Sequence, residues 1–177
     1  MAVTFVVEDG TGLSNATTYI SDSDADQLVE DFGLAWASGA SADDKKQNLN
    51  AATRYIDARY HVAWQSYRST EAQALDWPRY GVVDTDGWEI ADNVIPAKLK
   101  QAVVEVAVYR NNNGNAFPDL DNPGALKREK IKIDVLEFEE EYLGGNSGSE
   151  VAEKVDALMS DYLSSGGRGA NVEVRRG

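Results

Sequence analysis

The sequence predicts a mainly α protein: a small bundle of about four helices with a minor β hairpin or strand element and extended N- and C-terminal arms. Apolar residues recur at three- and four-residue spacing in several segments, and each segment follows a capping residue or a proline. A single strong turn signal, Asp86-Gly87, stands between two short apolar runs. Glycine-rich runs at 144–148 and 166–169 predict one helical domain over 1–165 and a C-terminal arm over 166–177.

The N-terminal half contains two helices with clear start signals. Ser21 or Ser23 can cap a helix that runs to about Phe32, and Ser41 can cap a longer helix that ends near His61. The other predicted elements of this half are a strand over the β-branched residues 3–7 and a short helical turn over 70–75.

The stretch from Trp77 to Ile90 predicts a rigid surface hairpin. Pro78 biases Trp77 toward an extended conformation, and Asp86-Gly87 suits the tip of a tight turn with Gly87 at positive φ. We expect Trp77 and Trp88 to anchor this hairpin. It contains no nucleophile and no histidine, so it predicts a docking surface rather than an active site.

The C-terminal half begins with the clearest core helix, from Pro96 to about Arg110. Its apolar residues cover most of the helix circumference, which predicts packing between neighbouring helices or subunits. The elements predicted after it are an irregular segment over 117–124, a strand over 131–135, a helix that begins at Ser149 or Glu150, and a short terminal strand over 172–175.

The chain is strongly acidic, with a formal net charge of −13, and no lysine or arginine precedes Lys45. Nucleic-acid binding draws much of its affinity from cations that neutralise phosphates, so a body of this charge should repel DNA. The charge indicates either a solvated surface or the lumen of a ring through which DNA slides without being gripped.

Several chemistries find no support in the sequence. The chain has no cysteine and one histidine, His61, which we expect to be partly buried and which leaves little for zinc or a histidine-based triad. Asp84-Thr85-Asp86-Gly87 fits a calcium loop poorly, because Val82 and Asn93 fall at ligand positions. No carboxylate stands among apolar residues that would raise its pKa. We therefore predict no enzyme, no cofactor and no metal.

The aromatic residues allow two interpretations. They could stack on single-stranded bases, but that mechanism also needs a cationic groove, and the arginines interleaved with them are few. We favour packing in the core and at subunit contacts, where tryptophan, tyrosine and arginine are enriched. The aromatics concerned are Trp36, Trp64, Trp77, Trp88, Tyr60, Tyr67 and Tyr80, and the arginines are Arg54, Arg59, Arg68 and Arg79.

Four stretches carry a resemblance to a known family. They are the hairpin segment at 77–90, the N-terminal run Val3 to Ser21, the run Ala51 to Asp57, and the glycine-rich C-terminus ending Val172 to Gly177. Together they resemble the head–tail connector adaptor (head-completion) proteins of tailed bacteriophages, a family that includes relatives labelled DnaT-like ssDNA-binding proteins. Tyr80, where a smaller residue is expected, and the region from Phe117 to Tyr142 depart from the family pattern.

The resemblance implies a structural protein of the virion neck. Its subunits would form a ring, commonly dodecameric, between the portal protein and a tail or neck protein. The ring would extend the channel and retain packaged double-stranded DNA without specific binding. The resemblance implies no cofactor, no membrane, and assembly in the host cytoplasm.

For the portal and subunit interface we predict residues of the C-terminal arm and of the hairpin. They are Arg168, Val172, Val174, Arg175, Arg176, Trp77, Arg79 and Trp88. The arm combines a glycine hinge with a β-prone, locally basic end that could pair with a partner's strand edge.

Two further functions stay open. The first is a single-stranded-DNA-binding accessory protein for replication, which retention on immobilised DNA at low salt would reveal. The second is an acidic DNA mimic, which needs ordered rows of carboxylates.

Overall fold

The structure, a computed structural model, describes residues 3–118 and 147–164 and confirms the mainly α class. Its elements in chain order are α1 (Asp22–Asp31), α2 (Ala42–Tyr60), β1 (Tyr67–Arg68), β2 (Arg79–Tyr80), α3 (Ala97–Asn112), α4 (Ser147–Met159) and the 3₁₀ helix η1 (Ser160–Tyr162). Among these residues, no helix is long and apolar enough to span a bilayer.

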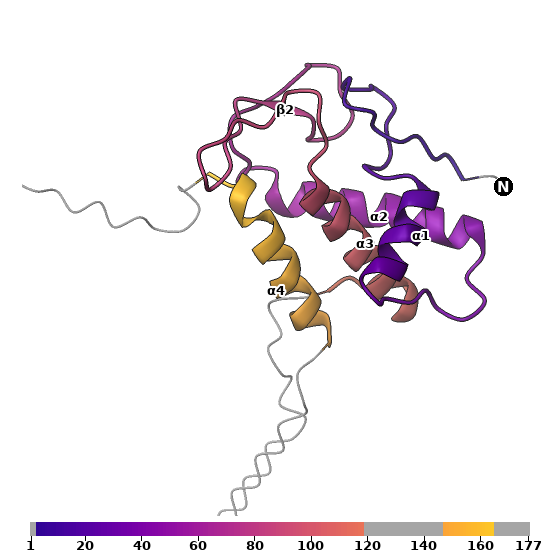
Figure 1. Cartoon of the computed structure of the whole chain (residues 1–177). Coiled ribbons are helices and arrows are strands. Elements are labelled where there is room, and N and C mark those ends of the chain that lie inside the picture. The colour runs from indigo at the N-terminus through magenta and orange to yellow at the C-terminus, as the bar shows by residue number, and fades with distance from the viewer. Residues whose placement is uncertain (1–2, 119–146, 165–177) are drawn as a thin grey trace, which may run out of the picture.

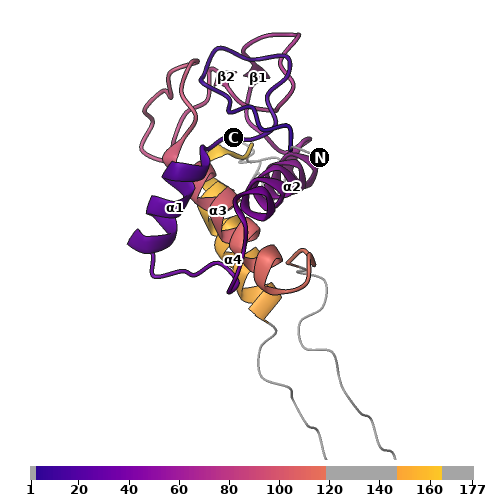
Figure 2. The same cartoon turned by 90° about the vertical axis from the view of Figure 1, so that its right-hand side faces the viewer.

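Helix α3 lies at the centre of the bundle. It packs most extensively against α2 and α4, while α1 lies against both α2 and α3. The irregular segments before α1 and between α2 and α3 gather over one end of the helices (Figures 1 and 2). This loop layer carries the two short strands and most of the exposed aromatic side chains.

Local signals set the helix starts as predicted. The Ser21 hydroxyl accepts a hydrogen bond from the Asp24 amide at the start of α1. Ser41 and Asp44 form a reciprocal capping box at the start of α2. Pro96 precedes the first residue of α3, where its missing N–H leaves no helical hydrogen bond unmade.

The prediction that α3 is sandwiched is confirmed within the chain itself. Its residues Leu99, Ala102, Val103, Val106 and Ala107 have no exposed surface. The apolar side chains that enclose them come from α2 and α4 and include Leu49, Ile56, Val155 and Met159. Burial of so many aliphatic side chains is the main source of stability for the domain.

Three local predictions are wrong. Residues 3–7 form one bridge, between Val7 and Thr18, rather than a strand, because the partner segment turns into α1 directly afterwards. Residues 70–75 form bends and no helical turn. Helix α4 begins at Ser147, two residues inside the predicted glycine-rich break. The predicted strands at 131–135 and 172–175 lie outside the described residues.

The β element differs in part from the predicted hairpin. Strand β2 pairs antiparallel with β1, which was not predicted, and places Tyr67 opposite Tyr80. A second, smaller hairpin follows at 82–90, closed by a bridge between Val83 and Glu89. Its tip is the predicted one, since the Gly87 amide donates to the Asp84 carbonyl at 3.1 Å.

Gly87 has φ +88°, which confirms the predicted left-handed conformation, and no atom lies near the position of an added Cβ. We expect Gly87→Val to lower the free energy of unfolding by about 1–2 kcal/mol through backbone strain alone. Gly87→Asn is the matched control, because asparagine tolerates this conformation. Urea denaturation measures both variants, and equal stabilities would contradict the strained turn.

Candidate interaction face

Four large apolar side chains are exposed on β1, β2 and the 82–90 hairpin. The exposed fractions are 68% for Tyr67, 48% for Tyr80, 39% for Val83 and 74% for Trp88. The rings of Tyr67 and Tyr80 stack at a centroid distance of 5.6 Å with an interplanar angle of 26°. We call these four residues the aromatic face. Tyr67 and Tyr80 thus form a contiguous exposed apolar patch, and Val83 and Trp88 are exposed on the hairpin that follows β2; such patches are typical of binding surfaces.

Backbone and amide contacts hold this face in place. The Gln65 side chain donates to the Val83 carbonyl and accepts from the Val83 amide, so it links the hairpin to the segment before β1. Within the hairpin, Asp84 Oδ1 accepts hydrogen bonds from the amides of Asp86 and Trp88 at 3.0 and 2.8 Å. Local hydrogen bonds therefore hold the backbone of the 82–90 hairpin and connect it to the segment before β1.

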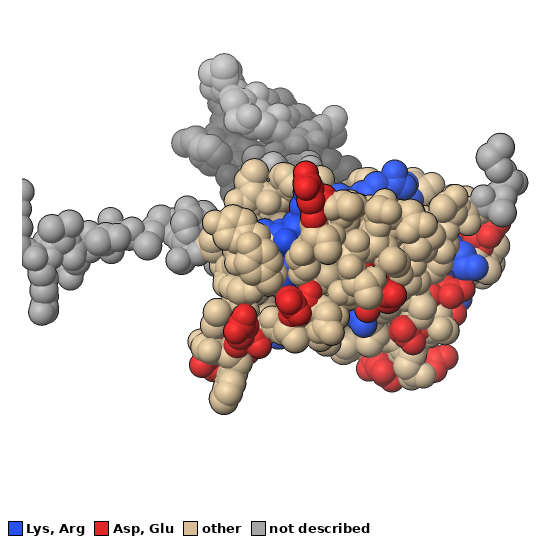
Figure 3. All heavy atoms as spheres, turned by 90° about the horizontal axis from the view of Figure 1, so that it is seen from above, with Lys and Arg blue, Asp and Glu red and all other residues tan. Residues whose placement is uncertain are grey.

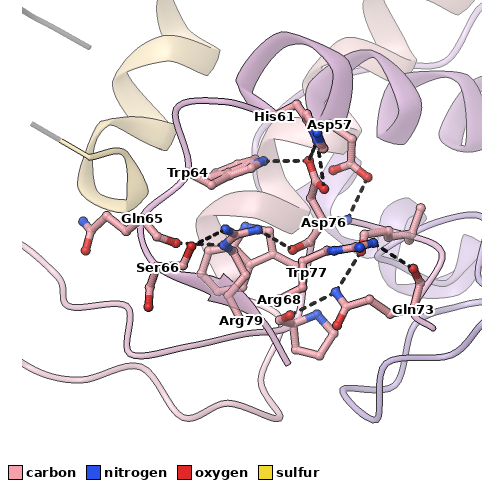
Figure 4. Close-up of polar contacts among 12 residues, drawn as sticks. Asp57, His61, Trp64, Gln65, Ser66, Arg68, Gln73, Asp76, Trp77 and Arg79 are labelled. Carbon is pink, nitrogen blue, oxygen red and sulfur yellow. Dashed lines mark hydrogen bonds and ion pairs between the residues drawn. The ribbon is translucent and has the colours of Figure 1, made fainter. Parts of the chain in front are cut away.

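Beneath the face, the buried guanidinium of Arg79 joins three separate carbonyl groups (Figure 4). Its Nε donates to the Gln65 carbonyl at 2.8 Å, one Nη to the Ser66 carbonyl at 2.7 Å, and the other to the Asp76 carbonyl at 3.1 Å. Burial lowers the pKa of Arg79. Because its donors are engaged in the interior, Arg79 is a structural residue and offers no charge to a partner.

A second polar cluster joins α2 to the segment before β2 (Figure 4). Asp57 Oδ1 accepts from the Tyr19 hydroxyl at 2.6 Å, and Asp57 Oδ2 accepts from the Asp76 amide at 3.2 Å. The Asp76 carboxylate accepts from Trp64 Nε1 at 3.1 Å and lies 3.0 Å from His61 Nδ1. The His61 side chain is exposed, so the prediction that it is partly buried is wrong.

Asp57 contradicts the prediction that no carboxyl group here has a raised pKa. Burial raises the pKa of Asp57 to about 7; the hydrogen bond from Tyr19 opposes this shift, and the charge of Asp76 adds to it. Both Asp57 oxygens accept hydrogen bonds from protein donors, so the group ties α2 to the segments around Tyr19 and Asp76.

The predicted interface residues of the hairpin region separate into two groups. Trp88 is exposed, as a contact residue must be. Trp77 is fully buried and packs edge-on against Trp64 and Tyr162, so it and Arg79 belong to the interior. Trp77 thus does not anchor the hairpin as a surface residue. The predicted arm residues Arg168, Val172, Val174, Arg175 and Arg176 lie outside the described residues.

The same division applies to the aromatic residues considered for base stacking. Trp64, Trp77 and Tyr60 are buried in the core and Trp36 is partly buried against it, as the packing interpretation predicts. Tyr67, Tyr80 and Trp88 are exposed, which leaves a stacking role open for these three. The sequence offered no signal for the pairing of Tyr67 with Tyr80, because a long irregular segment separates the two strands.

Charge around the aromatic face is sparse and mixed. Arg68, on β1, is exposed and donates to the Gln73 carbonyl, while Asp86 and Glu89 are exposed on the hairpin. Figure 3 shows acidic and basic side chains interspersed over a largely neutral surface, without a continuous basic band on that face. Within residues 3–118 and 147–164 no cluster of three histidine, aspartate or glutamate side chains could hold a metal ion.

Comparison with known protein families gives a match over nearly the whole chain. Residues 3–177 match the family described as "Putative DnaT-like ssDNA binding protein". No curated protein and no solved structure matches the chain at a significant level. The matched range includes the whole aromatic face, whereas the resemblance to head–tail adaptors stays a prediction.

Proposed function

The chain belongs to the family of DnaT-like ssDNA binding proteins, and from this premise we propose that it binds single-stranded DNA through the aromatic face. The observation that carries the proposal is the exposure of Tyr67, Tyr80 and Trp88 on a loop layer held by local hydrogen bonds. Every base has a π face, so exposed aromatic rings bind single strands with little dependence on sequence.

The charge of the chain sets the strength expected of this binding. Stacking on one aromatic side chain contributes about 1–3 kcal/mol per base. Phosphate neutralisation adds little here, because Arg68 is accompanied by Asp86 and Glu89. We therefore expect modest affinity with a shallow dependence on salt, unlike the steep dependence of highly basic DNA-binding proteins.

Fluorescence anisotropy of a labelled oligothymidine, at about 50 mM salt where charge screening is weak, tests the proposal. Trp88→Ala and Tyr67→Ala should each raise the Kd about 5- to 100-fold, in line with the loss of one stacking partner. Phe32→Ala is the matched control, because Phe32 is also exposed, at 44%, but lies at the end of α1. Equal affinity of all three variants and the parent chain would refute the proposal.

A second candidate is a phage head–tail adaptor ring. It is favoured by an exposed tryptophan among acidic neighbours on a chain of net charge −13, which suits a protein partner better than DNA. In this proposal the aromatic face and the arm at 166–177 contact subunits, portal protein and tail. A measurement of particle size with and without portal protein tests it. The adaptor is supported if rings form with portal protein and Trp88→Ala prevents their formation. The same protein should then show no binding of oligothymidine.

A further inference from the structure

A pocket of about 680 Å³ lies away from the aromatic face, between the N-terminal segment, α2 and the end of α3. Its volume is in the range of small-molecule sites. None of its lining residues is acidic, which is unusual in a chain of net charge −13. The polar side chains that line it are Thr4, Thr17, Gln47, Asn50, Arg54, Arg110 and Asn115.

The two arginines of this pocket are not neutralised within the described ranges. Five other cations of the described residues pair with carboxylates: Lys45 with Asp26, Lys46 with Asp22, Arg59 with Asp156, Lys98 with Asp161 and Lys154 with Glu105. In contrast, Arg110 donates to the neutral amides of Asn48 and Asn115 at 2.7 Å, and Arg54 donates to the Asn50 carbonyl at 3.4 Å.

The two charges also repel each other. Burial lowers the pKa of Arg110, and the positive charge of Arg54 lowers it further. An anion between them would offset this repulsion and replace the water lost on burial. The arrangement therefore has the electrostatics of an anion site.

Two residues that line the pocket carry buried polar atoms without a partner. Across the part of the chain that the structure describes, three buried side-chain polar atoms have no hydrogen-bond partner, and two of them, Arg110 Nε and Asn50 Oδ1, belong to pocket-lining residues. Asn50 is 6% exposed, and its Nδ2 donates to the Thr4 carbonyl at 2.8 Å, which leaves Oδ1 as a free acceptor. A buried polar atom without a partner is costly, so such an atom favours binding of a water molecule, an ion or a ligand group that satisfies it.

The two unpartnered atoms, Arg110 Nε and Asn50 Oδ1, indicate which chemical groups a ligand of this pocket would carry. One is a guanidinium donor, which suits a phosphate oxygen, and the other is an acceptor, which suits an amino group such as that on a nucleobase. An aromatic surface lies next to them: Arg110 lies 5.1 Å from the ring centroid of Phe117, which stacks on Tyr55 at 5.0 Å. We propose that the Arg54–Arg110 pocket binds the phosphate group of a nucleotide, either a free mononucleotide or a unit of a DNA strand.

This site does not rest on the function proposed above, and the two can be tested separately. Isothermal titration calorimetry of the full chain with inorganic phosphate, a deoxycytidine monophosphate and a short oligocytidine detects binding. Arg54→Gln and Arg110→Gln should each weaken binding about 10- to 100-fold, the loss expected for one charge-assisted hydrogen bond. Arg68→Gln, which removes an exposed arginine of β1 that does not line the pocket, is the matched control and should bind phosphate and the mononucleotide as the parent chain does.

Arg54 is exposed, so Arg54→Gln should keep its fold even if Arg110→Gln does not. Gln47→Glu gives an independent test, because it adds a carboxylate to the pocket without removing an arginine and should also abolish binding. If phosphate and the mononucleotide bind as tightly as the oligonucleotide, the ligand is a free nucleotide. Binding of the oligonucleotide alone would identify a strand as the ligand of this pocket only if it is weakened in Arg54→Gln and kept in Trp88→Ala, which removes a ring of the aromatic face. No saturable binding of any of the three, or an equal loss in Arg68→Gln, would overturn the proposal.

Discussion

Arg79→Met should lower the free energy of unfolding by about 3–5 kcal/mol. The change removes donors to the carbonyls of Gln65, Ser66 and Asp76, which belong to segments on both sides of β1. A carbonyl left buried without a donor costs about 1–3 kcal/mol, which applies in full to Asp76 and in part to the half-buried bonds to Gln65 and Ser66. Urea denaturation followed by tryptophan fluorescence measures the loss, since Trp64 and Trp77 are buried close to these groups.

The matched control is Arg68→Met. Arg68 lies directly opposite Arg79 in the β1–β2 register, but its side chain is exposed. Its substitution should change the stability by about 0.5 kcal/mol or less, as is usual for surface sites. Arg79→Lys should fall between the two, because a single ammonium cannot reproduce the fork of the guanidinium. A loss for Arg79→Met no larger than for Arg68→Met would show that the three hydrogen bonds contribute little.

Asp57→Asn should flatten the dependence of stability on pH between about pH 4 and pH 7. The pKa of Asp57 is about 7 in the folded chain and about 3.9 in an unfolded one, so the folded state holds this proton more tightly. The stabilising contribution is therefore fully present below about pH 4 and is lost as the pH rises through 7. The difference in pKa corresponds to an upper limit of about 4 kcal/mol.

Urea midpoints at pH 5 and pH 8 test this expectation. The parent chain should lose stability between pH 5 and pH 8 through Asp57, and the Asp57→Asn variant should lose less. The absolute stability of this variant should fall, because one amide oxygen cannot replace two carboxylate oxygens. Asp86→Asn, which changes an exposed carboxylate on the hairpin, should keep the pH dependence of the parent chain. Identical slopes for Asp57→Asn and the parent chain would contradict the raised pKa.

The helices were predictable because their signals are local. Ser21, Ser41 and Pro96 each set a helix start through contacts within one turn, and the apolar spacing in α2 and α3 identified their buried faces. The pairing of Tyr67 with Tyr80 joins residues far apart in the sequence through an irregular segment, so no local pattern predicts it. The same holds for the pocket formed by α2 and α3 around Arg54 and Arg110.

The burial of Asp57 could have been predicted from the sequence and was not. Asp57 follows Thr53 by four residues and precedes Tyr60 by three, and this spacing places it beside the buried stripe of α2. The burial of Trp77 and the exposure of Trp88 could not be separated by composition, because both are tryptophans next to turn signals. Only the tertiary contacts of Trp77 with Trp64 and Tyr162 distinguish them.

The ion pair between α3 and α4 fixes the register in which α4 packs on α3. Helix α3 is apolar around most of its circumference, so shape and hydrophobicity alone would allow α4 to dock in neighbouring registers of similar energy. Glu105 is 4% exposed on α3, and Lys154 of α4 donates to it. A shifted register would leave this carboxylate buried without a partner, at a cost of several kcal/mol. The apolar contacts thus supply the energy of association, and one carboxylate makes a single register the native one.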